Sequence, residues 1–213
     1  MDSLSEEMDK LMARLLSGSK LLQLGRYMRD LLQKNHVKVS GSNGATISNL
    51  TITAPDSSPN TDGIDISDST NIHIYDSTIG TGDDCIALSN QTSQVYVKGV
   101  VCGPGHGISV GSLGMNGGSA QVEEIHVDTC SFKGTQNGAR IKKSAVQISD
   151  VSFTEFWGTS ATDDAIKLSC IETVGCANIT VDDISIKSAS GNGETYSCIN
   201  AHGTVNKTFP PLT

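Results

Sequence analysis

The sequence predicts an all-β fold, a right-handed parallel β-helix, and a repeated motif is the first reason. Asp62, Asp84 and His106 recur at intervals of 22 residues, each at the start of a similar short apolar segment. A fixed period in this range is typical of a solenoid, in which each repeat is one coil that buries its apolar face against neighbouring coils. Neighbouring strands lie about 4.8 Å apart, so equivalent side chains stack. We therefore expect these residues, with Asp83 beside them, to form one cluster on one face.

The second reason is the alternation of apolar and polar residues within these segments. Successive side chains of a strand point to opposite faces, so each of five coils presents a pair of small aliphatic residues inward. The pairs are Ile64 and Ile66, Ile86 and Leu88, Ile108 and Val110, Ala139 and Ile141, and Ile166 and Leu168. They form the predicted core.

A second strand in each coil is predicted by segments rich in β-branched residues. These segments are 46–52, 71–79, 94–101, 125–132, 146–153 and 179–186. A β-sandwich with strands at similar spacing is the competing fold. It does not explain why the Asp and His positions repeat in register, so the solenoid is the better prediction.

Composition suits stacked aliphatic columns and tight corners, because 37% of the 213 residues are hydrophobic, 4% are aromatic and 22 are glycine. The scarcity of aromatic residues argues against a nucleic-acid surface built on base stacking. A formal net charge of −8 argues against a phosphate-rich partner. We expect a monomer that binds no nucleic acid, no membrane, no metal and no cofactor.

Four motifs follow one another along the chain: SPNTDGI (58–64), GTGDDC (80–85), CGPGHGISVGS (102–112) and NGARIK (137–142). In this order they resemble the signature segments of the plant polygalacturonases, a family of pectin-degrading glycoside hydrolases. The resemblance extends from about Val37 to the C-terminus. It implies a pectin-lyase-like β-helix as catalytic domain over 37–213, hydrolysis of α-1,4 galacturonosidic linkages by inverting acid–base catalysis, and a secreted protein that modifies the cell wall.

The carboxyl groups of the motifs suit this chemistry. Hydrolysis of a glycosidic bond needs one carboxylic acid to protonate the leaving oxygen and one carboxylate to activate water or attack carbon. Asp62, Asp83 and Asp84 provide both, and crowding raises the pKa of at least one of them through like-charge repulsion. By resemblance Asp83 is the general acid, while Asp62 and Asp84 hold and deprotonate the water. His106 is expected to tune the protonation of the acid by hydrogen bonding.

Two basic residues indicate an anionic substrate. Arg140 and Lys142 alternate outward around the inward-facing Ile141, so both can meet a sugar carboxylate. Pectin or polygalacturonate is therefore the expected partner.

Other interpretations stay open. Asp, Asn and Gly are favoured at turns for local backbone reasons, so NTDG and GDD taken alone fit corners. The same charged groove also fits a non-catalytic galacturonan-binding solenoid or a purely structural β-helix. Pectin lyases share the fold, but they call for calcium-binding carboxylates and a basic catalytic group, which these motifs do not resemble. Outside the motifs, His73, His126 and His202 are expected in strands or on the surface, and Asp163 and Asp164 in a turn.

The six cysteines are informative about compartment. The resemblance implies disulfides between Cys85 and Cys102 and between Cys170 and Cys176, and such bridges need an oxidising environment. We expect Cys198 to be unpaired, and Cys130 has no obvious partner. The spacing does not fit a zinc site. Glycosylation sequons at Asn49, Asn90, Asn178 and Asn206 agree with secretion.

Residues 1–36 depart from the family. Leu4, Met8, Leu11 and Leu15, and then Leu21, Leu24, Met28 and Leu31, fall at helical spacing. Ser3 and Glu6 form a capping box. We therefore predict a helical N-terminal segment in place of the leading coils, and its apolar runs are too short for a signal peptide.

A second departure follows Lys142. Family members continue from RIK into roughly two further coils, whereas here the chain runs directly into KSAVQISDVSF (143–153). Loss of whole coils is compatible with a continuous solenoid but removes a wall of the groove next to Arg140. With the C-terminus ending in PPLT, this predicts an incomplete polygalacturonase that retains its catalytic residues.

Overall fold

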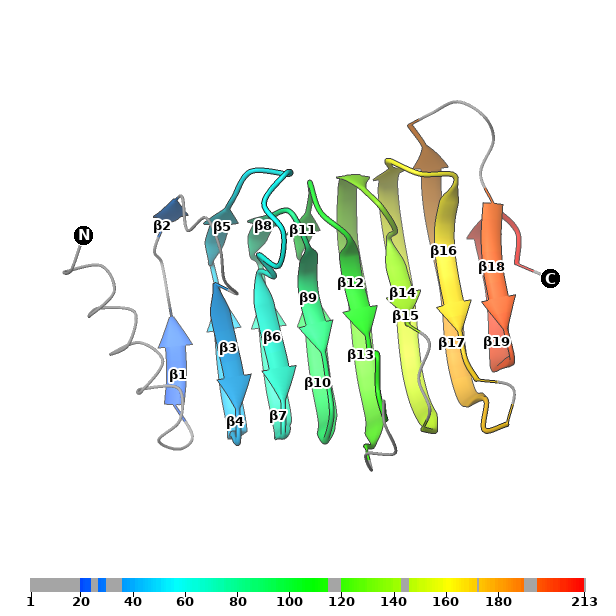
Figure 1. Cartoon of the computed structure of the whole chain (residues 1–213), viewed down its shortest axis with the longest axis horizontal. Coiled ribbons are helices and arrows are strands. Elements are labelled where there is room, and N and C mark those ends of the chain that lie inside the picture. Colours follow the sequence, from blue (N-terminus) through cyan, green and yellow to red (C-terminus); the bar gives the residue numbers. More distant parts are fainter. Residues whose placement is uncertain are drawn as a thin grey trace.

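The chain forms a parallel β-solenoid in the computed structural model, which confirms the predicted fold class (Figure 1). The structure describes residues 20–23, 27–29, 36–114, 120–142, 146–171, 173–189 and 195–212. Within these residues two sheets run along the solenoid axis, one of seven strands and one of twelve. Neighbouring strands pair in parallel because the chain returns to the same edge once per coil.

The strands of the smaller sheet, in order along the axis, are β3 (Val37–Ser40), β6 (Ile64–Ser67), β9 (Asp84–Leu88), β12 (Gly107–Val110), β14 (Ala139–Ile141), β16 (Asp164–Ser169) and β18 (Thr195–Ile199). The strands of the larger sheet are β1 (Lys20–Gln23), β2 (Tyr27–Arg29), β4 (Asn43–Ser48), β5 (Thr51–Thr53), β7 (Ser69–Tyr75), β8 (Thr78–Gly80), β10 (Thr92–Lys98), β11 (Val101–Cys102), β13 (Val122–Thr135), β15 (Ile148–Ser160), β17 (Cys176–Ser188) and β19 (Ala201–Phe209).

The core lies between the sheets and consists of the predicted aliphatic columns. Ile64 pairs in register with Ile86, and Ile86 with Ile108. None of these three side chains is exposed to solvent. Burying each isoleucine stabilises the fold by roughly 1.5–3 kcal/mol relative to an exposed side chain. The predicted stacking of the three residues in one buried column is confirmed.

The larger sheet turns a corner once per coil. In the early coils the residue after the first strand has a positive φ: 56° at Asn49, 46° at Asp76 and 67° at Gly99. Gly, Asn and Asp adopt this left-handed conformation more readily than other residues. The corner therefore recurs at the same place in each coil even where coil lengths differ.

The helical prediction is wrong for part of the N-terminal segment. Strands β1 and β2 pair in parallel with β4 and β5, so these residues extend the larger sheet. Backbone pairing with a neighbouring coil has overridden the helical spacing of Leu21 and Met28, since local propensity is weaker than tertiary context. The rest of the predicted helical segment lies outside the described residues, and the domain boundary at residue 36 remains a prediction.

The solenoid continues in register across the predicted deletion after Lys142. Strand β14 pairs with β12 on one side and with β16 on the other. In the larger sheet β13 pairs with β15 from Val122 with Ile148 to Thr135 with Ser160. The connection between β14 and β15 includes residues 143–145, which lie outside the described ones. Within the described part of the chain, no helix has the length and apolarity to cross a membrane.

Candidate active site

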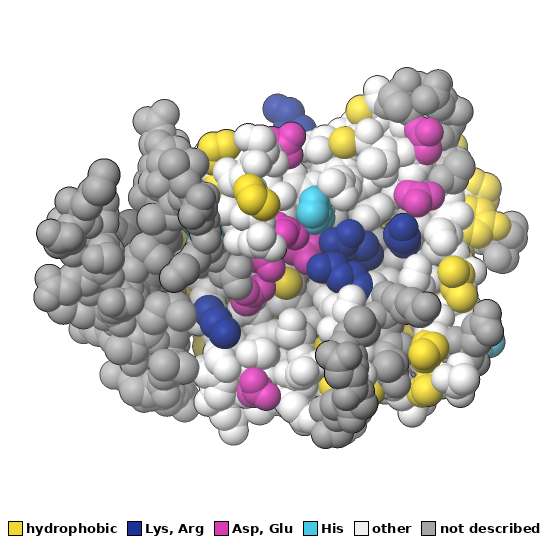
Figure 2. Space-filling model, in the orientation of Figure 1, with side chains coloured by type: hydrophobic (Ala, Val, Ile, Leu, Met, Phe, Trp, Pro, Cys, Tyr) yellow, Lys and Arg dark blue, Asp and Glu magenta, His cyan; other side chains and the backbone are white. Residues whose placement is uncertain are grey.

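The motif residues meet on the outer face of the seven-stranded sheet. Asp62 and Asp83 lie in the turns before β6 and β9, Asp84 is the first residue of β9, and His106 directly precedes β12. Arg140 lies in β14, and Lys142 follows it. Figure 2 shows acidic side chains, a histidine and basic side chains gathered at the centre of this face. The cluster predicted from the 22-residue repeat is therefore present.

Hydrogen bonds hold the turns before β6 and β9 together. Thr61 Oγ1 donates to the carbonyl of Ser58 over 2.8 Å and accepts from the Gly82 N–H over 3.0 Å. Gly82 is required for this approach, because a Cβ atom there would lie 2.1 Å from the Ser58 carbonyl oxygen. The NTDG and GDD segments thus form hydrogen-bonded turns, as expected if their residues were chosen for the backbone alone. The same turns hold the carboxyl groups in place.

Asp84 is the buried anchor of the site, with no exposed side-chain surface. Its Oδ1 accepts hydrogen bonds from Ser109 Oγ and Arg140 Nη2, both over 2.6 Å, and its Oδ2 accepts one from Lys142 Nζ over 2.5 Å. Arg140 Nε also donates to Ser109 Oγ over 3.1 Å, which closes the network.

This network changes the expected partner of the two basic residues. The sequence paired Arg140 and Lys142 with a sugar carboxylate, whereas in the structure both are ion-paired with Asp84. Their side chains are still 16% and 28% exposed. A ligand carboxylate can therefore reach them from the solvent side.

Asp83 is paired with His106. His106 Nδ1 lies 2.9 Å from Asp83 Oδ1, and the backbone N–H of Asp84 donates to the same oxygen over 2.9 Å. The side chains of His106 and Asp83 are 26% and 22% exposed. The hydrogen bond expected between His106 and Asp83 is therefore present, and it fixes the orientation of a carboxyl group that faces solvent.

Asp62 is hydrogen-bonded to a carboxyl group that the motifs did not identify, that of Asp65 in β6. Burial, this hydrogen bond and the charges of Asp65, Asp83 and Asp84 raise the pKa of Asp62 to about 8. Burial also raises the pKa of Asp65. The two carboxyl groups thus share a proton, as expected when like charges are held together. Burial is the largest cause of the raised pKa of Asp62, and the charges of Asp83 and Asp84, on which the sequence-based expectation rested, add to it in the same direction.

Asp65 and Ser109 were not identified from the sequence as site residues, although the alternation of inward and outward side chains in their strands indicated their position. Both alternate with buried aliphatic residues and therefore point outward. Register pairing places Asp65, Ala87, Ser109 and Arg140 in one outward column on β6, β9, β12 and β14. Polar residues that face outward and pair in register with a motif residue are therefore candidates for the site.

One group of side chains has the geometry of a metal site. Ligand atoms of Asp83, Asp84 and His106 all lie within 4.8 Å of one another. Two cationic side chains already neutralise Asp84, however, and a divalent cation there would be repelled by them. The donor set therefore does not suit a metal ion.

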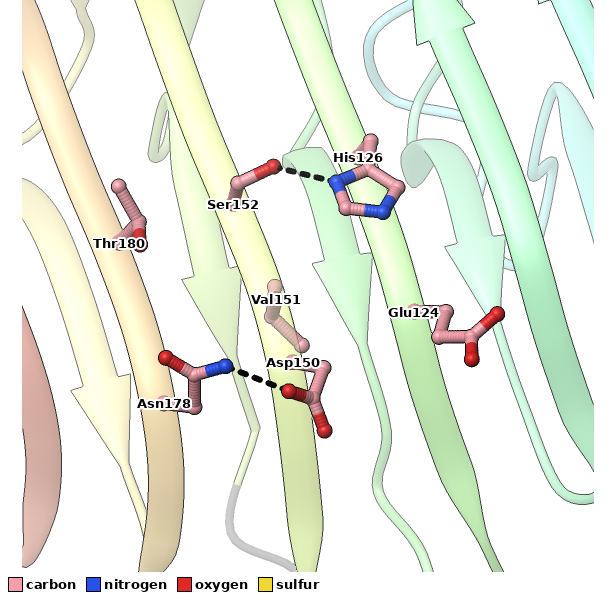
Figure 3. Close-up of a pocket in the computed structure, with 7 residues that line it drawn as sticks. All are labelled: Glu124, His126, Asp150, Val151, Ser152, Asn178 and Thr180. Carbon is pink, nitrogen blue, oxygen red and sulfur yellow. Dashed lines mark hydrogen bonds between the residues drawn. The ribbon is translucent and has the colours of Figure 1, made fainter.

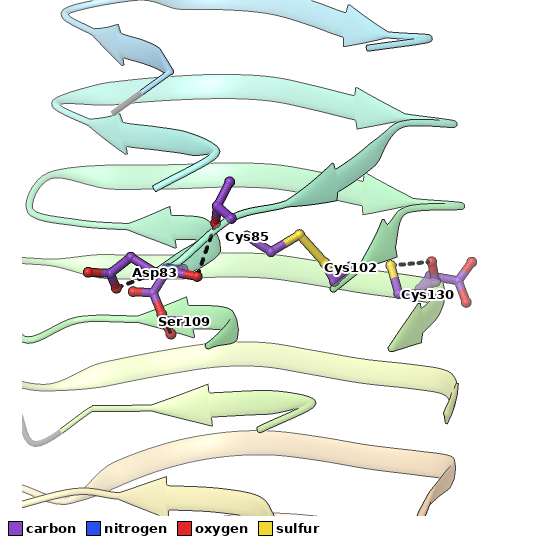
Figure 4. Close-up of a disulfide and its surroundings, with 8 residues drawn as sticks. Asp83, Cys85, Cys102, Ser109 and Cys130 are labelled. Carbon is purple, nitrogen blue, oxygen red and sulfur yellow. Dashed lines mark hydrogen bonds between the residues drawn. A yellow bond between two sulfur atoms is a disulfide. The ribbon is translucent and has the colours of Figure 1, made fainter. Parts of the chain in front are cut away.

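Both predicted disulfides are present, and one lies beside the site. Cys85, next to Asp84, is bonded to Cys102 of β11 (Figure 4). Cys170 and Cys176 close a short loop. Cys130 and Cys198 are free, the first buried and the second exposed. Burial raises the pKa of the Cys130 thiol to about 12, so it stays protonated and unreactive near the disulfide.

A separate cavity of about 350 Å³ lies on the larger sheet and is lined by residues of β13, β15 and β17 (Figure 3). His126 Nδ1 is 2.8 Å from Ser152 Oγ, and Asn178 Nδ2 donates to Asp150 Oδ1 over 2.5 Å. These two contacts link polar side chains of neighbouring strands across its wall. His126 is a strand residue, as predicted.

Comparisons with known proteins match most of the chain. The model of glycosyl hydrolases family 28 matches residues 29–144 and 142–208. A probable polygalacturonase of Arabidopsis thaliana is 39% identical over 224 residues, covering 83% of this chain and 49% of that protein. A polygalacturonase of Cryptomeria japonica is 39% identical, covering 78% of this chain and 40% of that protein. The crystal structure of endo-xylogalacturonan hydrolase from Aspergillus tubingensis is similar with a TM-score of 0.69 and 26% identity, covering 83% of this chain and 56% of that one.

The chain spans about half the length of these relatives. The two segments matched by the family model meet at residues 142–144, and the Arabidopsis alignment is longer than the part of this chain that it covers. Both findings agree with missing residues after Lys142. The matched segments contain every motif residue of the cluster, and the chain therefore belongs to glycosyl hydrolases family 28.

Proposed function

We propose that this chain hydrolyses α-1,4 galacturonosidic linkages of pectin by inverting acid–base catalysis. The observation that carries the proposal is that the three motif carboxyl groups lie on one face with His106 and two basic side chains. The names of the plant relatives support polygalacturonan as substrate class. We include in the proposal a secreted protein of the cell wall, which the two disulfides support.

Asp83 is the proposed general acid. Both polar contacts of its carboxyl group described above involve Oδ1, so we assign proton donation to Oδ2. As the bond between the anomeric carbon and the leaving oxygen breaks, that oxygen takes the proton of Asp83. His106 holds the carboxyl group in position during the transfer.

Asp62 is the proposed base, acting together with Asp65. A pair that shares one proton carries a single negative charge between the two macroscopic pKa values. It therefore still accepts a proton from the water that attacks the anomeric carbon. The hydrogen bond to Asp65 and the raised pKa of Asp62 support this assignment.

Asp84 is buried, so its role depends on substrate. A galacturonate carboxylate competes with Asp84 for Arg140 and Lys142, because both cations are exposed on their solvent side. Partial release of these cations frees an oxygen of Asp84 to hold the attacking water. Substrate binding and water positioning are thereby coupled in the proposal.

The alternative function is a non-catalytic galacturonan-binding solenoid, and the junction after Lys142 favours it. The family resemblance implies further coils after β14, and the two segments matched by the family model, which meet at residues 142–144, support their absence from this groove. Positioning contributes on the order of 7–11 kcal/mol to catalysis, so an incomplete groove reduces turnover even with every motif residue in place. We expect turnover well below that of a full-length relative.

Reducing-sugar release from polygalacturonate tests the function. Asp83→Asn is expected to abolish release with an unchanged fold, whereas the matched control Asp68→Asn, at an exposed position, retains it. Fully methyl-esterified pectin is expected to be a poor substrate because it offers no carboxylate to Arg140. Binding of polygalacturonate without any turnover would select the alternative, and absence of both would refute the two proposals together.

A further inference from the structure

Lys167 lies beside the basic end of the site, in β16. It pairs in register with Arg140 of β14. Its neighbours Ile166 and Leu168 are each 2% exposed and face the core. By strand parity Lys167 therefore faces outward, and it continues the outward column that runs through Ser109 and Arg140.

The adjacency of Lys167 and Arg140 follows from the direct junction after Lys142. The chain passes from β14 into β15 through residues 142–147, and β15 pairs along its whole length with β13. Strand β16 consequently lies directly against β14, with about 4.8 Å between their backbones. The alignment with the Arabidopsis relative is longer than the part of this chain that it covers, and the segments matched by the family model meet at residues 142–144, between β14 and β15.

The amine of Lys167 is more accessible than those of the basic residues already described. Its side chain is 42% exposed, against 16% for Arg140 and 28% for Lys142. Its acidic neighbour is Asp164, whose Oδ2 lies 3.7 Å away and whose side chain is 44% exposed. An exposed ion pair of this length contributes little to stability. A ligand carboxylate can therefore displace Asp164 at small cost.

We propose that Lys167 binds the carboxylate of a second uronate residue, adjacent to the one bound by Arg140 and Lys142. This inference rests on the proposed polyuronide ligand. The polymer lies along the solenoid axis, across β9, β12, β14 and β16. Its scissile bond faces Asp83, and its acidic groups follow the basic part of the outward column. Lys167 thus takes part in the binding that the absent coils would otherwise provide.

The experiment measures binding of oligogalacturonates by calorimetry, with Asp83→Asn as background so that hydrolysis does not interfere. Lys167→Met is expected to weaken binding of a hexamer about tenfold, which equals about 1.4 kcal/mol, and to reduce the dependence of affinity on salt. The dimer, which is too short to reach both cation sites and the scissile position, should lose much less. Lys187→Met, an exposed lysine of β17 in the other sheet, is the matched control and should change neither.

Asp164→Asn provides a second, independent reading. It removes the carboxylate that competes with the ligand for Lys167 and should tighten hexamer binding. A purely structural ion pair predicts loss of stability and unchanged affinity, and that result would count against the inference. Equal hexamer affinities of the Lys167→Met and Lys187→Met variants would overturn the inference and leave the proposed function standing. If Lys167→Met loses hexamer binding, the inference is supported. If the parent chain also shows no turnover, catalysis is refuted while the inference stands. No binding by any variant would overturn both.

Discussion

Replacing Asp84 with Asn is the sharpest test of how the site is held together. The substitution keeps the shape of the side chain but removes a charge that has no exposed surface and that pairs with Arg140 and Lys142. Removing one partner of a buried ion pair typically costs about 3–5 kcal/mol, because the other charge stays buried without compensation. Both cations keep some exposure, so we expect a loss near the lower end, about 3 kcal/mol.

A loss of this size is large for a domain whose total stability is of the order of 5–15 kcal/mol. Urea unfolding followed by circular dichroism measures it directly, and the slope with denaturant should stay constant if only the native state is affected. At about 2–4 °C per kcal/mol for a chain of this length, the melting temperature should fall by about 6–12 °C.

A double variant separates charge from shape. Combining Asp84→Asn with Lys142→Met removes the carboxylate together with one of its two cations. We expect the double variant to be more stable than Asp84→Asn alone, because less uncompensated positive charge remains. A loss below about 1 kcal/mol for Asp84→Asn, or strictly additive losses in the double variant, would refute the view of Asp84 as an electrostatic anchor.

Three further predictions concern protonation, packing and covalent linkage. Because the pKa of Asp62 is raised from 3.8 to about 8 in the folded state, stability should fall as the pH rises from about 4 to 8, and Asp65→Asn should flatten this dependence in urea titrations at several pH values. Ile86→Ala should cost about 2–5 kcal/mol in the same assay, because it empties the centre of a fully buried column. Replacing both Cys85 and Cys102 with Ala should cost about 2–4 kcal/mol, and reductant should lower the melting temperature of the variant less than that of the parent, because only the Cys170–Cys176 bond remains reducible.

The part of the fold that follows from periodicity was predictable. Ile64, Ile86 and Ile108 are separated by a constant 22 residues, so one alignment of the repeats predicts their stacking. The next coil is longer, and Ala139 pairs with Ile108 only after a detour through β13. In that coil the alternation of apolar and polar residues still showed which side chains face inward. The number of residues that separate β12 from β14 did not follow from the 22-residue period.

The residues that form the site could be predicted from the motifs, but the polar contacts between them could not. The motifs identified Asp84, Arg140 and Lys142, yet not that the three would pair with one another, because this depends on the direction of long side chains across strands. Asp65 was overlooked because it belongs to no motif and was treated as the polar position of a strand. The error at β1 and β2 has the same origin, since pairing with a distant strand is invisible to local spacing.

The constant register between β13 and β15 from Val122 to Lys133 has a consequence for how such chains diversify. If whole coils can be removed while the remaining ones stay in phase, then each coil behaves as an exchangeable module that carries its own outward side chain to the groove. Recombination at coil boundaries would then alter which residue stands next to Arg140 without any change in the core. Libraries built by inserting or deleting complete coils at residue 142 would explore ligand preference more economically than point substitution does.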